Sequence, residues 1–139
     1  MGALDAAERS LQRALALAPD NAAANLNVGL LKAERNNRTQ AEAYLRRALK
    51  SDPQLAQAAY NLCVLTAEDR LGEAVGWRRM AAGLAPQNPA YAYTLAFYLD
   101  RNGARAEAIR TLKALVAKHP GYRDAQALLG ELTAKKPEP

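Results

Sequence analysis

Cys63 and Asn61 lie two residues apart in the segment AAYNLCVL, and a thiol beside an amide could begin a catalytic site. A cysteine nucleophile needs a neighbouring base or cation that lowers the pKa of its thiol. The chain has a single histidine, His119, which lies far along the sequence and directly before a proline. We therefore predict that Cys63 is structural and that the chain is not an enzyme.

The residue types that hold metals and phosphates are equally scarce. One cysteine and one histidine cannot supply the four ligands of a structural zinc site. No glycine-rich segment has the spacing of a phosphate-binding loop. We expect neither a metal nor a cofactor.

The composition favours helices. Alanine supplies much of the 50% hydrophobic fraction, whereas aromatic residues make up only 6%. Alanine is the strongest helix former, and β-branched residues nowhere alternate with polar ones over a useful length. No apolar run approaches the roughly 20 residues that span a bilayer, so no membrane insertion is expected. The single cysteine and the non-secretory amino terminus leave the compartment open, with the cytoplasm favoured.

Prolines recur at a regular interval through these predicted helices. The series comprises Pro19, Pro53, Pro86 and Pro120, so its steps are equal to within a single position. A slot of small residues follows each proline with the same steps, at Gly29, Cys63, Ala96 and Gly130. Two series in one register indicate a repeat, and they place Cys63 where glycine or alanine serves as well.

Each repeat contains two helical stripes, one before and one after its proline. Ala41, Leu45 and Ala48 form such a stripe, because spacings of four and three residues share one face of a helix. A helix pair of this length cannot bury both apolar faces alone, so copies must stack. The sequence therefore predicts an all-α fold, an α-solenoid of antiparallel helix pairs with about eight helices.

The segment NVGLLKAERNNRTQAEAYLRRALKSDP resembles the tetratricopeptide repeat (TPR) family, whose unit is a helix–turn–helix. The family prefers, in this order, a small residue, an alanine, a bulky apolar residue, an alanine and a proline. At those positions the segment has Gly29, Ala41, Leu45, Ala48 and Pro53. The resemblance covers nearly the whole chain and implies a TPR superhelix that binds proteins.

Two departures from the family pattern affect packing. The fourth position, aromatic in the family, is Asn25, Ala59 and Ala92. Arg78 occupies a bulky apolar position, beside Trp77. We expect local rotation or fraying of that helix, with Trp77 taking over part of the packing.

The register divides the chain into successive segments. We predict that 1–18 is the second helix of a truncated repeat. Three repeats follow at 22–54, 56–87 and 89–121, and the middle one is a residue short. A capping helix at 123–134 and a polar tail at 135–139 come last. The first segment has no partner helix before it. We expect either a fragment of a longer array or self-association through this uncovered helix.

The resemblance also implies a binding site. TPR ligands generally bind in the concave groove lined by the first helix of each pair. The predicted groove positions are Leu26, Asn27, Leu30, Tyr60, Asn61, Val64, Tyr93, Thr94 and Phe97. The amides could bond a peptide backbone and the aromatic rings could anchor an apolar side chain, although solvation and packing also account for them. The implied partner is a peptide or helix of another protein. No lysine or arginine occupies the positions that grip a terminal carboxylate in chaperone-binding TPR domains.

The alternative site is basic. Arg46, Arg79 and Lys113 occupy equivalent positions on the second helices, and the net charge is +5. Such a ridge could bind nucleic acid or another acidic partner, but a solvated outer face explains it better. A purely structural spacer is a further alternative.

Overall fold

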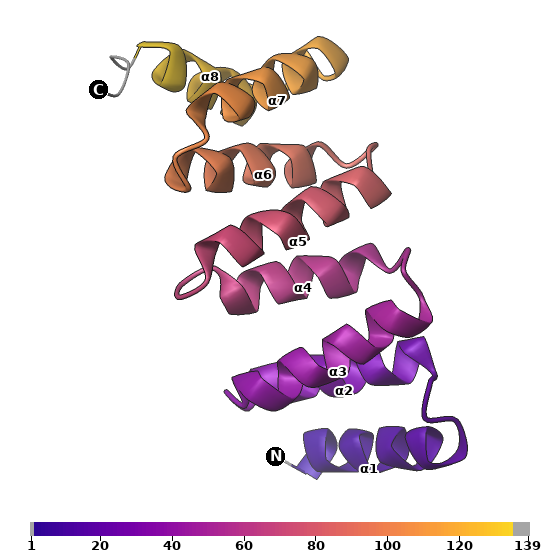
Figure 1. Cartoon of the computed structure of the whole chain (residues 1–139). Coiled ribbons are helices and arrows are strands. Elements are labelled where there is room, and N and C mark those ends of the chain that lie inside the picture. Colours follow the sequence, from indigo (N-terminus) through magenta and orange to yellow (C-terminus); the bar gives the residue numbers. More distant parts are fainter. Residues whose placement is uncertain (1, 135–139) are drawn as a thin grey trace. The chain divides into compact units, whose positions relative to one another are not determined.

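The structure, a computed structural model, describes residues 2–134, and each regular element in that range is an α-helix. The chain divides into two compact units, Met1–Thr66 and Ala67–Pro139. The first unit holds α1 (Gly2–Leu17), α2 (Ala22–Glu34), α3 (Arg38–Ser51) and α4 (Ala56–Thr66) (Figure 1). The second holds α5 (Leu71–Leu84), α6 (Pro89–Arg101), α7 (Arg105–Lys118) and α8 (Arg123–Ala134). The expected all-α class is confirmed over these residues.

The two units share one helix pattern, offset by two repeats. Both ends of α6 follow those of α2 by the same interval, and the same interval separates α7 from α3. The turns agree as well, because Asn36 and Gly103 are counterparts at this offset and both have positive φ, at 59° and 84°. Asparagine and glycine are the residues that adopt this left-handed conformation most readily. The helices lie within the predicted repeat ranges, while the repeat boundaries themselves stay a prediction and the predicted tail lies outside the described residues.

Asparagine side chains begin several of the helices. The Asn21 Oδ1 accepts a hydrogen bond from the Ala24 N–H at 2.8 Å, and the Asn88 Oδ1 accepts one from the Ala90 N–H at 3.1 Å. An N-cap of this kind satisfies one of the backbone donors that the first turn leaves unpaired. The proline two residues before each cap cannot continue the preceding helix, so the proline series marks the turns.

The stripes predicted from the spacing form the cores of both units. Ala41 and Leu45 of α3 are fully buried, as are Ala108 and Leu112 of α7. The alanines let the neighbouring helix approach closely, and the leucines fill the space beside them. Helices α2 and α3 therefore form a tightly packed pair, as do α6 and α7.

The small-residue series is not uniform in its surroundings. Gly29, Cys63 and Ala96 are buried, but Gly130 of α8 is exposed, and a Cβ placed there would meet nothing within 4 Å. The common register of the four residues therefore does not give Gly130 the buried surroundings of the other three. No helix within the described residues follows α8 to cover this face.

Replacement of glycine by alanine is expected to have opposite effects on stability at two positions. Gly76→Ala is expected to raise the free energy of unfolding by about 0.5–1 kcal/mol, because the site lies inside α5 with nothing within 4 Å of an added Cβ. Gly29→Ala is expected to lose that gain or become destabilising, because its Cβ would lie 3.0 Å from the Leu45 Cγ. Urea unfolding of both variants checks the pair. Equal stabilisation by both would contradict the close approach at Gly29.

The expected fraying around Arg78 is wrong. Helix α5 is continuous from Leu71 to Leu84, and Arg78 is only 3% exposed. Its guanidinium carbon lies 5.4 Å from the centroid of the Tyr98 ring in α6. A guanidinium stacked on an aromatic face gains cation–π attraction while its methylene stem packs like an apolar residue. An arginine therefore fills the bulky position without breaking the helix.

Candidate peptide-binding surfaces

In the first unit, the predicted groove residues of α2 and α4 differ in exposure. Leu26 is buried and Leu30 is half-buried, so both belong partly to the packing between helices. Asn27 is exposed, and its side chain has no hydrogen bond within the described residues. On α4, Tyr60 is 36% and Val64 50% exposed. The outward face of α4 thus offers a ring and a branched aliphatic side chain to a partner.

The predicted polar groove residues are partly occupied by their own helices. The Asn61 Nδ2 donates to the Gln57 carbonyl at 2.8 Å, which uses one of its donors. The Thr94 hydroxyl donates to the Ala90 carbonyl at 2.8 Å and lies 3.1 Å from that of Tyr91. A hydroxyl bonded to its own preceding turn contributes little as a donor to a ligand. Among these residues, Asn27 is therefore the best placed to bond a peptide backbone.

In the second unit, aromatic side chains form two pairs. The Tyr93 ring meets that of Tyr122 edge-on, with centroids 5.9 Å apart. The Phe97 ring meets that of Tyr98 in the same manner at 5.6 Å, and the Arg101 guanidinium carbon lies 5.8 Å from the Phe97 centroid. Edge-to-face contacts of this kind fix ring orientation. Phe97 remains 42% exposed, so it is held in place yet accessible.

Tyr122, which the sequence reasoning did not select, supports Tyr93 from the turn before α8. Burial raises the pKa of the Tyr122 phenol, and the charges of Asp124 and Tyr93 add to the shift. The phenol is therefore neutral at physiological pH. An aromatic residue two positions after the repeat proline was the available signal, but nothing in the sequence says which ring it meets.

The predicted basic ridge is partly neutralised by neighbouring carboxylates. The Arg46 Nη2 lies 2.8 Å from the Glu42 Oε1, and the Arg79 Nη2 lies 2.7 Å from the Glu107 Oε1. Lys113 is exposed on α7. A charge paired with an adjacent acid attracts phosphate less strongly than an unpaired one, so the nucleic-acid alternative is not favoured.

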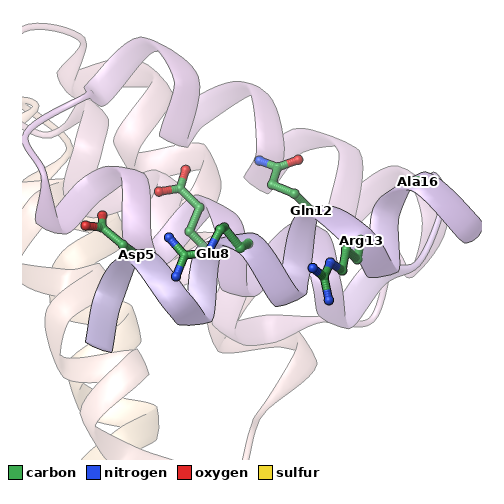
Figure 2. Close-up of a pocket in the computed structure, with 6 residues that line it drawn as sticks. Asp5, Glu8, Gln12, Arg13 and Ala16 are labelled. Carbon is green, nitrogen blue, oxygen red and sulfur yellow. The ribbon is translucent and has the colours of Figure 1, made fainter. Parts of the chain in front are cut away.

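An open pocket of about 560 Å³ runs along α1 and carries both charge signs. Figure 2 shows Asp5, Glu8, Gln12 and Arg13 on the face that lines it. The Glu8 carboxylate pairs with the Lys32 Nζ at 2.7 Å, so part of this polar surface already serves to attach α1 to α2. The pocket therefore does not present a free acid–base pair.

Ion pairs distinguish the α1–α2 contact from its counterpart in the second unit. Arg35, the residue that follows α2, pairs with Glu8 at 2.8 Å and also with Asp5. The counterparts of Glu8 and Lys32, two repeats later, are Val75 and Leu99, both buried. The same contact is thus partly ionic in one unit and apolar in the other.

Acidification is expected to loosen α1 from α2. The hydrogen bond from Lys32 lowers the pKa of the Glu8 carboxyl below its ordinary value of 4.5, and Arg35 adds to the effect. Because the folded-state pKa is the lower one, the stabilisation is present above the unfolded-state pKa and is lost as pH falls through the folded-state pKa. Protection factors for hydrogen exchange in α1 should fall in that range relative to those in α3.

Glu8→Gln is the matched control for this effect, since it keeps the side-chain size and removes the titrating group. In this variant the amides of α1 should be less protected from hydrogen exchange at neutral pH, and their protection should fall less on acidification. An identical acid response in both proteins would assign the effect to other carboxyl groups.

Helix α1 leaves part of its apolar stripe uncovered. Ala7 is exposed, whereas its counterparts Ala41 and Ala108 are fully buried, and Leu4 is 37% exposed. This exposure is compatible with the predicted self-association, which stays a prediction.

Neither a metal cluster nor a membrane helix is found in the described part of the chain. No group of three or more metal-ligating side chains forms within residues 2–134. No helix in the same range is both long and apolar enough to cross a membrane. Cys63 is fully buried and so lies away from any surface site.

Comparison with known proteins gives one family match and several related folds. Residues 1–63 match the family model described as tetratricopeptide repeat. No curated protein sequence matches the chain.

Solved structures resemble most of the chain. The crystal structure of MamA is 23% identical with a TM-score of 0.77, over 94% of this chain and 77% of MamA. YrrB, described as a TPR protein with an unusual peptide-binding site, is 21% identical with a TM-score of 0.73, over 89% of this chain and 64% of YrrB. The O-GlcNAc transferase of Thermobaculum terrenum is 27% identical with a TM-score of 0.67, over 84% of this chain but 23% of the transferase. The predicted α-solenoid fold class is confirmed by these likenesses.

Proposed function

Since residues 1–63 match the tetratricopeptide repeat model and most of the chain shares its fold with solved structures, we propose that the chain belongs to this family and is a non-catalytic scaffold that holds a peptide or helix of a partner protein. The partner binds the outward faces of the first helix of each pair, which in the first unit are α2 and α4 and in the second are α6 and α8. Apolar and aromatic side chains supply the anchors. Exposed side-chain amides such as that of Asn27 form hydrogen bonds with the backbone of the partner.

One observation carries this assignment. Of the large apolar side chains exposed in the described residues, half lie at predicted groove positions: Tyr60, Val64 and Phe97. Exposed apolar patches mark interaction sites, and aromatic side chains are enriched among the residues that dominate binding. Val64 and Phe97 are such equivalents, one step of the repeat apart.

The peptide-binding site described for YrrB supports a peptide as the partner, because YrrB shares this fold. A non-catalytic role is supported by the burial of Cys63, the single thiol, at a packing position. The transferase relative is matched over only 23% of its length, which gives no reason to carry its activity to this chain.

Site-specific photocrosslinking tests the proposal. A photoreactive residue placed at Val64 or Phe97 should capture the partner, whereas one placed at Arg46 or Lys113 should not. Both sets of positions are exposed, so solvent access alone cannot explain a difference. Crosslinking from the basic positions but not from Val64 or Phe97 would overturn the assignment.

A further inference from the structure

A second, separate hollow lies inside the second unit. Its volume is about 320 Å³. It is lined by the end of α5, the turn that leads into α6, Ala92 of α6, the C-terminal half of α7 and His119. This volume equals that of about ten water molecules in the liquid, far more than a packing defect, and falls within the usual size of ligand pockets. Its lining shares no residue with the proposed peptide-binding surface.

The offset of two repeats between the units shows how the lining of this hollow differs from the corresponding positions of the first unit. Ala92 lines the pocket, and its counterpart in the first unit is Asn25. Asn25 is 1% exposed, and its Nδ2 donates to the carbonyls of Pro19 and Asn21 at 3.0 Å each. The counterparts of Pro19 and Asn21 are Pro86 and Asn88, which also line the pocket. In the first unit the Asn25 side chain occupies the place of Ala92. That unit has a hollow of about 620 Å³ whose lining includes Arg47 and Ser51, the counterparts of Ala114 and Lys118, so the two units differ in what lines the hollow.

Other lining positions also carry smaller side chains than their counterparts in the first unit, and these positions lie on different helices. In each case the first unit carries the larger side chain and the second the smaller one: Leu15 and Ala82, Tyr44 and Thr111, and Arg47 and Ala114. Leu115, whose counterpart is Ala48, is enlarged instead and adds apolar surface. Several independent reductions around one point produce an apolar pocket rather than a single missing side chain.

The charge of the lining has changed too. Lys118 and His119 stand where the first unit has Ser51 and Asp52, and no acidic residue lines the pocket. Asn88 adds a donor, since its Oδ1 is used as a cap while its Nδ2 has no hydrogen bond within the described residues. An ammonium and an amide N–H beside apolar walls suit a ligand that is apolar at one end and anionic at the other.

We propose that this pocket binds a small free monocarboxylic acid with an apolar chain, its chain against Ala92, Ala114 and Leu115 and its carboxylate near Lys118 and Asn88. The acid is a second ligand, independent of the partner protein. The proposal rests on the pocket alone and stands or falls apart from the peptide-binding surface.

Titration of the isotopically labelled full chain with hexanoate tests this by NMR, with the ionic strength held constant by chloride. We expect saturable shifts of the amide signals of Ala92, Thr111 and Lys118. Hexanamide, which has the same chain without the charge, should bind about tenfold more weakly. Equal binding of hexanoate and hexanamide, or shifts spread over the whole basic surface, would overturn the proposal.

Two substitutions copy the first unit into the second and serve as matched variants. Ala92→Asn and Thr111→Tyr should each fill the pocket and weaken hexanoate binding by about tenfold or more, while thermal unfolding shows that the fold persists. Lys118→Gln should weaken hexanoate but not hexanamide. Undiminished hexanoate binding by the two filling variants, or binding only of a carboxylate carried on a peptide, would overturn the free-acid assignment.

Discussion

Replacing Leu62 by alanine is expected to lower the free energy of unfolding by about 2–5 kcal/mol. Leu62 lies on the inner face of α4 and is fully buried. Truncation removes the transfer free energy of its methyl groups and leaves a cavity that the neighbouring helices fill only in part. Urea unfolding measured by circular dichroism, with the slope m compared between variants, gives the change.

Val64→Ala is the matched control, two residues along the same helix. Val64 is 50% exposed, so its truncation should cost about 0.5 kcal/mol or less. The comparison separates burial from the helix propensity of alanine, which favours both variants. Losses of similar size in the two proteins would contradict the assignment of Leu62 to the core and Val64 to the surface.

Removing the two exposed rings together is expected to weaken partner binding by at least about tenfold, which corresponds to about 1.4 kcal/mol. The variant is Tyr60→Ala with Phe97→Ala. Aromatic anchors commonly contribute more than this to an interface. Since the side chains are 36% and 42% exposed, the loss of core packing should be smaller than that caused by Leu62→Ala.

The partner segment captured by crosslinking provides the ligand for this measurement by calorimetry. Arg46→Ala with Lys113→Ala is the matched double variant on the second helices, and it should keep the parent affinity at physiological salt. The two single ring variants then show which unit contributes more. Full affinity in the folded ring variant would remove Tyr60 and Phe97 from the binding surface, and strong loss in the basic variant would move the site to the second helices.

The repeat and its helices could be read from the sequence because both depend on local, periodic properties. The proline series marks the turns, since proline cannot continue a helix, and the alanine and leucine spacing of four and three residues fixes the buried face. Cys63 could be assigned to packing for the same reason, because its register equals that of Gly29.

Other features were decided only when side chains from different helices met. Arg78 was expected to disturb α5, yet the Tyr98 ring of α6 accommodates its guanidinium. The pairing of Tyr93 with Tyr122 likewise joins residues whose contact no period encodes. The pocket beside Ala92 needed reductions on three helices to coincide at one point. Periodicity specifies which face of a helix is buried, whereas the partner of each side chain depends on the packing of neighbouring helices, and that is a property of the tertiary structure alone.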